Sequence, residues 1–205
     1  MTTVGILGGG QLARMLALSG APLGLRFLVM DTEADACAGQ FAPLLVGDYR
    51  DETALAEFAS RVDVATFDFE NVPSESAEWL AARVPVFPNP RALAVAQDRL
   101  VEKEFVSGLG IQVAPFAPVD DIASLKRAIS AIKLPAILKT RRFGYDGKGQ
   151  ALIRNSSEAE AAFQAIGGVP AVLEAMVLFE REISMIVVRG KNGELRYYDP
   201  VENVH

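Results

Sequence analysis

The sequence has very few of the residues that build disulfides and metal centres. Its 205 residues include one cysteine, Cys37, and one histidine, His205. A single thiol excludes an intrachain disulfide, which is typical of proteins in a reducing cytoplasm. Only His205 is available as an imidazole partner for Cys37, so a small structural side chain is favoured over a catalytic nucleophile. We therefore expect a cytoplasmic protein.

Long apolar runs and an excess of positive charge are also missing. The apolar start of the chain is interrupted by glycines and by Arg14, so we expect neither a signal peptide nor a membrane span. The net charge of −6 argues against nucleic acid and anionic membranes as partners. A phosphate ligand would need a local basic cluster, and one comprises Lys139, Arg141, Arg142 and Lys148.

The first part of the chain alternates short apolar runs with helical patterns. Half of all residues are hydrophobic and 22% are charged, which allows a packed core in one or two domains. Strands are predicted at residues 4–7, 26–30, 62–67 and 84–87. Helices are predicted after the first glycine turn, at 51–61 and at 74–83. This alternation predicts an α/β fold with a Rossmann-like parallel sheet that is covered on both faces.

Two loops follow the strands of this predicted sheet, where ligands of such folds bind. The glycines at residues 8–10 place bare amides at a helix N-terminus, where they hold an anion or simply let the helix pack tightly. Residues 68–71 offer polar side chains to a sugar or a phosphate, or form a solvated loop. Because residues 8–13 fit G-x-G-x-x-A and Asp31 ends the next strand, an NAD-binding oxidoreductase is an alternative.

Several prolines occur in the middle of the chain. Between them, residues 91–107 are predicted to form one long helix. Most of its charged residues (Asp98, Arg99, Glu102 and Lys103) are interpreted as a solvated face with intrahelical ion pairs. We expect a first domain at residues 1–95, a lobe with a glycine-rich loop at 96–175 and the start of a further lobe at 176–205.

The second half mixes helices with hairpin-like strands, which predicts an α+β lobe. Helices are expected at residues 121–133 and 157–166, the second with a capping box from Ser157 to Glu160. Strands are expected at 136–138, 151–153 and 171–173. A hairpin of residues 183–189 and 194–198 is expected around Asn192 and Gly193.

The strongest functional signal is the loop at residues 141–150, which lies between two predicted strands and contains the glycine-rich segment 144–150. Its glycines let backbone amides close on phosphate oxygens. Lys148 in the segment and Lys139 on the preceding strand supply positive charge for phosphates. The segment is not a P-loop, because no G-x-x-x-x-G-K-[ST] occurs. Glu174 and Glu182 are either ribose-binding carboxylates or ordinary strand-end charges.

Several segments occur in an order that resembles a known family: G-G-G-Q-L-A-R-M at 8–15, E-N-V at 70–72, G-Y-D-G-K-G-Q at 144–150, F-E-R-E-I-S at 179–184 and E-N-V-H at 202–205. Over the whole chain they resemble the N5-carboxyaminoimidazole ribonucleotide synthase family of ATP-grasp ligases. The resemblance implies ATP-dependent carboxylation of 5-aminoimidazole ribonucleotide by bicarbonate, through carboxyphosphate, in purine biosynthesis. It also implies ATP and Mg²⁺ as cofactors and a homodimer. A formate-using glycinamide ribonucleotide transformylase and a non-catalytic ATP-binding domain are the alternatives.

The resemblance also implies roles for individual residues. Contacts to ATP are implied for Arg99, Lys139, Gly144, Tyr145, Asp146, Gly147, Lys148, Gly149, Gln150, Glu174, Ala175, Met176, Val177, Glu182 and His205. Of these, the catalytic residues would be Lys139, Lys148 and His205. Contacts to the ribonucleotide are implied for Gln11, Leu12, Glu70, Asn71 and Tyr145.

The resemblance also indicates what the chain does not contain. Members of the family continue for about another domain length, which holds the magnesium ligands and the arginines for the substrate phosphate. We therefore expect no metal ligand within residues 1–205 and no turnover by this chain alone. Asp68 stands where a glutamate is expected, which shortens one carboxylate of the substrate loop.

Overall fold

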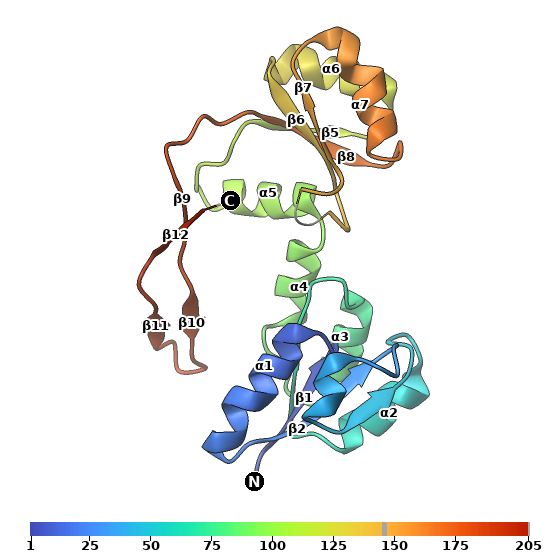
Figure 1. Ribbon diagram of the computed structural model, residues 1–205, viewed down its shortest axis with the longest axis vertical. Helices are drawn as coiled ribbons and strands as arrows, with labels where there is room; N and C mark the ends of the chain where they lie inside the picture. Colours follow the sequence, from blue (N-terminus) through green and yellow to red (C-terminus); the bar gives the residue numbers. More distant parts are fainter. Residues whose placement is uncertain (145–146, 205) are drawn as a thin grey trace.

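The computed structural model describes residues 1–144 and 147–204. Two sheet-containing parts are joined by two helices, and an arm of short strands runs beside them (Figure 1). No helix within the described ranges is long and apolar enough to cross a membrane.

The N-terminal part is a parallel four-stranded sheet in the order β3-β2-β1-β4. Its strands are β1 (Thr3–Leu7), β2 (Arg26–Asp31), β3 (Leu44–Val46) and β4 (Val64–Phe67). Its helical segments are α1 (Gln11–Gly20), η1 (Ala21–Leu23), η2 (Cys37–Gln40), α2 (Glu52–Ser60) and α3 (Ser74–Ala81). The predicted parallel sheet is confirmed.

Both faces of this sheet are buried, as alternation along β1 requires. Leu7 packs with Phe58 of α2 and Leu80 of α3 in one core cluster, whereas its neighbour Ile6 lies in another. The second cluster contains Ala13 and Ala17 of α1, so this helix meets the sheet through small side chains. Leu12, Met15, Leu16 and Leu18 of α1 are left exposed.

Two details of this sheet differ from the expectation. The short strand β3 was not predicted, and residues 84–87 form only an isolated parallel bridge between Ala65 and Val86. The bridge is held by Ala65, which donates to the carbonyl of Pro85, and by Phe87, which donates to that of Ala65. It cannot extend toward the start of the segment, because Pro85 has no N–H to donate.

The connection between the two parts is formed by two helices, α4 (Pro90–Ala96) and α5 (Arg99–Gly108). The prediction of one continuous helix at 91–107 is therefore wrong. Asp98 adopts an extended backbone (φ −128°, ψ 113°), and its carboxylate accepts from the N–H groups of Leu100 and Val101. Asp98 thus caps α5 from outside the helix, which separates α5 from α4.

The second part is an antiparallel sheet in the order β5-β8-β6-β7. Its strands are β5 (Phe116–Val119), β6 (Ala136–Thr140), β7 (Gln150–Ile153) and β8 (Ala171–Ala175). The helical segments α6 (Ile122–Ile132), η3 (Ser156–Glu158) and α7 (Ala159–Ala165) accompany it. Leu125 and Phe163 pack with Leu138 and Leu173 in its core. The predicted α+β lobe is confirmed.

The capping box predicted at Ser157 does not form. The side chain of Asn155 accepts from the N–H of Ser157, so Asn155 caps the short η3 turn and α7 begins only after Glu158. The carboxylate of Glu158 accepts a hydrogen bond from the backbone N–H of Arg154, four residues earlier in the chain.

The arm of the chain consists of β9 (Glu182–Ser184), β10 (Val187–Arg189), β11 (Leu195–Tyr197) and β12 (Val201–Asn203). β10 pairs with β11 as a hairpin around the predicted turn, with Gly193 at φ 82°. The strand predicted at 183–189 is, however, divided between β9 and β10, which lie in different sheets. β9 pairs with β12 in a separate two-stranded ladder. The residues of these ladders are exposed, apart from the half-buried Asn203.

Candidate functional site

The glycine-rich segment connects β6 to β7, and its two ends are held close together. The N–H of Thr140 donates to the carbonyl of Gly149 at 2.8 Å. A Cβ added at Gly149, which has φ 69°, would lie 2.6 Å from Oγ1 of Thr140, and one at Gly144 would lie 2.8 Å from Nη1 of Arg99. A side chain at Gly149 would be strained by its backbone conformation as well as by this contact, and one at Gly144 would displace the guanidinium of Arg99. Tyr145 and Asp146 lie outside the described residues, as does His205.

Side chains at the start of α5 form hydrogen bonds with this loop. Arg99 donates from Nη1 to the carbonyl of Thr140 at 2.8 Å and from Nη2 to that of Gly144 at 2.6 Å. Arg141 donates from Nη2 to Oδ2 of Asp98 at 2.7 Å. The interpretation of these residues as a solvated face with intrahelical pairs is therefore wrong for Asp98 and Arg99. Their side chains reach loop residues more than 40 positions away.

The ion pair with Arg141 controls the protonation of Asp98. Burial pushes the pKa of Asp98 upward, but hydrogen bonds from Arg141 and from the backbone N–H of Leu100 outweigh it and hold the pKa below its ordinary value. The same carboxylate raises the pKa of Arg141. A carboxylate with a lowered pKa stabilises the fold above its unfolded-state pKa, and this contribution is lost as the pH falls through the folded-state value.

We therefore expect Asp98→Ala to lower the free energy of unfolding by about 2 kcal/mol at pH 7, from a lost cap and a lost half-buried ion pair. The deficit should shrink at pH values below the ordinary pKa of an aspartate, about 3.9, and vanish as the pH falls through the lowered folded-state pKa of Asp98. Urea denaturation at several pH values measures it. Glu104→Ala, an exposed acid of the same helix, is the control. A deficit that does not change with pH would contradict the role of the carboxylate.

Glu174 is buried beside two lysines. Its residue is 7% exposed, and its Oε2 lies 3.1 Å from Nζ of Lys139 on β6 and 3.2 Å from Nζ of Lys103 on α5. Lys139 and Glu174 lie on adjacent antiparallel strands, which accounts for their meeting. Lys103 was not predicted as a site residue, because its helical spacing only suggested an exposed position.

The segment after Glu174 leaves the sheet with its backbone anchored. The N–H of Ala175 donates to the carbonyl of Pro115, and that of Met176 donates to the carbonyl of Pro135. The side chains of Met176 and Val177 are exposed. Ala175 and Met176, which the resemblance implies as contacts to ATP, therefore have a fixed backbone directly beyond the Lys139–Glu174 pair.

Other predicted residues are placed apart from this pair. Glu182 lies on β9, in a different sheet, where its Oε1 accepts from Nδ2 of Asn203 at 2.8 Å. Gly147 and Lys148 are exposed on the loop, and Gln150 is exposed at the start of β7.

The glycine turn of the first part is filled by the protein's own carboxylates. Asp31 accepts from the N–H of Gly9 at 2.5 Å, and Asp68 accepts from that of Gly10 at 2.9 Å and that of Ala13 at 3.4 Å. A dinucleotide pyrophosphate at this helix N-terminus would have to displace both acids, which argues against the NAD-binding alternative. Burial and the charge of Asp31 raise the pKa of Asp68, although the backbone N–H donors oppose this shift.

The predicted substrate residues lie around this turn. Gln11 and Leu12 line a cavity of about 350 Å³ with Asp31 and Asp68. Glu70 lines another, of about 250 Å³, which it shares with Gln97, Arg99, Arg141, Arg142 and Gly144. Within the described part of the chain, Oδ1 of Asn71 is buried without a hydrogen-bond partner. Glu70 therefore lies beside the glycine-rich loop, whereas Gln11 and Leu12 lie at the glycine turn.

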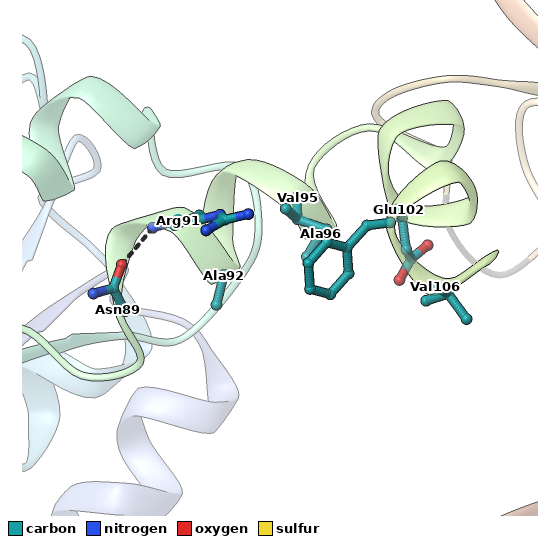
Figure 2. Close-up of a pocket in the computed structure, with 8 residues that line it drawn as sticks. Asn89, Arg91, Ala92, Val95, Ala96, Glu102 and Val106 are labelled. Carbon is teal, nitrogen blue, oxygen red and sulfur yellow. Dashed lines mark hydrogen bonds between the residues drawn. The ribbon is translucent and has the colours of Figure 1, made fainter. Parts of the chain in front are cut away.

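A cavity of about 540 Å³ opens between α4 and α5. Figure 2 shows Asn89, Arg91, Ala92, Val95, Ala96, Glu102 and Val106 around it. It contains none of the side chains that were predicted to bind ATP or the ribonucleotide. The chemistry is therefore expected at the glycine-rich loop, not in this apolar groove.

Comparisons with known proteins identify two matching domain families. Residues 1–97 match the ribonucleotide synthetase preATP-grasp domain, and residues 104–205 match the ATP-grasp domain. The chain is 46% identical to an N5-carboxyaminoimidazole ribonucleotide synthase of Pseudomonas aeruginosa, covering 98% of this chain and 56% of that protein. It spans about half the length of the curated relatives that it matches.

Solved structures show the same likeness. An N5-carboxyaminoimidazole synthetase from Staphylococcus aureus complexed with ADP matches all of this chain and 55% of its own, with a TM-score of 0.95 and 35% identity. An Aspergillus clavatus synthase in complex with ADP and 5-aminoimidazole ribonucleotide matches all of this chain and 54% of its own, with a TM-score of 0.89 and 27% identity.

Proposed function

We propose a function for this chain from the premise that it belongs to the N5-carboxyaminoimidazole ribonucleotide synthase family, whose N-terminal portion it matches. The proposed reaction is the ATP-dependent carboxylation of 5-aminoimidazole ribonucleotide by bicarbonate in the cytoplasm. This chain would supply the loop that binds ATP and the first part of the site for the ribonucleotide. Magnesium would be required as the partner of ATP.

The observation that carries the proposal is the position of Lys139 at the base of the glycine-rich loop. Lys139 is held by Glu174 and lies on the strand that enters the loop, while Arg99 fixes the backbone of Thr140 and Gly144. Positive side chains beside a glycine-rich loop fit the phosphates of ATP, whose transfer is catalysed largely by positioning and charge. Within the described residues, the buried Oγ1 of Thr140 has no hydrogen-bond partner.

The assignments to residues follow from this arrangement. The phosphates of ATP would be held by Lys139, Arg99 and the loop at 144–150. Lys148, which is part of this loop, would also contact the phosphates. The edge at 174–177 would receive adenine and Glu182 the ribose. When bound, ATP would supply the phosphoryl group that activates bicarbonate. Lys139 and Lys148 would hold the transferring phosphates, and the loop would exclude water from them.

The first part would receive the ribonucleotide. Gln11 and Leu12 line the cavity at the glycine turn, and Glu70 lines the cavity beside the glycine-rich loop. Asn71 follows Glu70 in the chain, and its buried Oδ1 has no partner among the described residues. Because the turn amides already bind Asp31 and Asp68, we expect these residues to contact the base and sugar, with the substrate phosphate held elsewhere. Tyr145 and His205, both outside the described residues, keep the roles that the resemblance implies.

A homodimer is part of the proposal. The exposed apolar side chains Met15, Leu16 and Leu18 on α1 support an association surface on the first part. Sedimentation of the protein at several concentrations tests this assembly.

The nucleotide site is tested by calorimetric titration with MgATP. We expect Lys139→Ala to weaken binding by about 10- to 100-fold, as for a lost charged hydrogen bond of roughly 1.5–3 kcal/mol. Lys126→Ala is the matched control, because Lys126 pairs with Glu160 on the exposed surface. Equal affinities for the two variants would refute the assignment of Lys139.

The reaction is tested by ADP release in the presence of each candidate acid. Bicarbonate together with 5-aminoimidazole ribonucleotide should stimulate ATP cleavage, whereas formate should not. Stimulation by formate with glycinamide ribonucleotide would favour the transformylase instead. The assay requires a protein of the relatives' full length, and the 205-residue chain assayed alone is expected to give no turnover.

A further inference from the structure

The junction between α4 and α5 touches both proposed ligand sites. Gln97, at the end of α4, is 5% exposed. Its Nε2 donates to the backbone carbonyl of Val72, directly after the proposed substrate residues Glu70 and Asn71. Its Oε1 accepts from Nη2 of Arg142 at 2.9 Å, two residues before the glycine-rich segment begins. One buried amide therefore bridges the two loops.

The residues next to Gln97 strengthen its connection to the glycine-rich loop. Asp98 holds Arg141, and Arg99 holds the carbonyls of Thr140 and Gly144. The side chains of three consecutive residues, 97–99, thus bind the start of the loop. Among the hydrogen bonds of the described residues, only that of Gln97 to Val72 also joins these three to the substrate loop. Gln97, Arg142 and Glu70 also line the same cavity of about 250 Å³.

We propose that Gln97 is a positioning residue that couples the glycine-rich loop to the substrate loop at residues 69–72. The inference rests on the proposed function, since it assumes that ATP orders the first loop. The side chain of Gln97 is buried, so movement of either loop away from it would leave a buried polar group unpaired. The two loops should therefore move together, and ATP binding should set the position of Glu70 and Asn71.

Amide hydrogen exchange of the 205-residue chain, with and without MgATP, tests this coupling. In the wild-type protein, MgATP should slow exchange by at least about tenfold both in the glycine-rich loop and at residues 69–72. Gln97→Met removes both hydrogen bonds at nearly constant size. It should keep the protection of the loop and lose that of residues 69–72. A purely structural role would raise exchange with and without ATP alike.

Two further variants cut the bridge at one end each. Gln97→Glu keeps the acceptor for Arg142 but loses the donor to Val72. Arg142→Met breaks the contact from the exposed loop side, so it serves if the buried substitution prevents folding. Both should lose the ATP-dependent protection of residues 69–72. Arg91→Met, an exposed arginine of α4 at the other cavity, is the matched control and should retain it.

The outcomes separate the coupling from the function on which it rests. Wild-type protection confined to the glycine-rich loop would overturn the coupling and leave the nucleotide site standing. Full protection of residues 69–72 in Gln97→Met and Arg142→Met would overturn it as well. No protection anywhere by MgATP would refute the proposed function, and the coupling with it.

Discussion

Replacing Gly8 with alanine is expected to lower the free energy of unfolding by about 3 kcal/mol, whereas the same change at Gly24 should cost only about 1 kcal/mol. Both glycines have a positive φ, 97° at Gly8 and 78° at Gly24, so both variants carry backbone strain. They differ in the space around the added methyl group. Nothing lies within 4 Å of it at Gly24, but at Gly8 it would lie 1.8 Å from Oδ1 of Asp68.

Asp68 cannot move away from an added methyl group without losing hydrogen bonds. Its carboxylate accepts from the N–H groups of Gly10 and Ala13, so it caps the start of α1 from the position directly after strand β4. Displacing it forfeits this cap and disturbs the cavity that Gln11 and Leu12 line. The steric clash at Gly8 therefore becomes a loss of hydrogen bonds.

Thermal denaturation followed by circular dichroism measures this difference. We expect Gly8→Ala to lower the Tm by about 6–12 °C and Gly24→Ala by only about 2–4 °C, for a chain of this size. Equal shifts for the two variants would show that Asp68 is not fixed against the turn.

Lys103→Met is expected to weaken MgATP binding by roughly 30-fold, about 2 kcal/mol, with a smaller effect on the unliganded fold. In the structure Glu174 is paired with both Lys103 and Lys139. If Lys139 turns to the phosphates, Lys103 remains as the partner of this buried carboxylate. Without Lys103, the same movement would leave Glu174 buried and unpaired, which is costly.

The test is a double-mutant cycle read by calorimetric titration with MgATP. The Glu174→Gln variant has no buried carboxylate that needs a positive partner. Adding Lys103→Met to this variant should therefore reduce its affinity for MgATP only slightly further. Lys126→Met provides a control on an exposed ion pair. An equal loss of affinity from Lys103→Met in both backgrounds would mean that Lys103 acts independently of Glu174.

Local patterns in the sequence were enough for the fold class and for the central loop. The alternation of apolar runs with helical periodicity predicted the parallel sheet, because strand and helix periods are local properties. The glycines at 144–150 and the strand that carries Lys139 were predicted for the same reason. The start of α5 was missed because a capping aspartate inside a helix-like pattern resembles an ordinary charged helical residue.

Contacts between distant segments were decided only by the tertiary structure. Asp31 and Asp68 occupy the turn amides because β2 and β4 flank β1 in the sheet, and no spacing in the sequence encodes that order. Lys103 meets Glu174 because α5 packs near β8. The sequence by itself determined the fold class and most of the strands and helices, and it predicted that the glycine-rich loop binds phosphates. Which side chains meet between them was set by strand order and helix packing, since these bring together residues more than 20 positions apart.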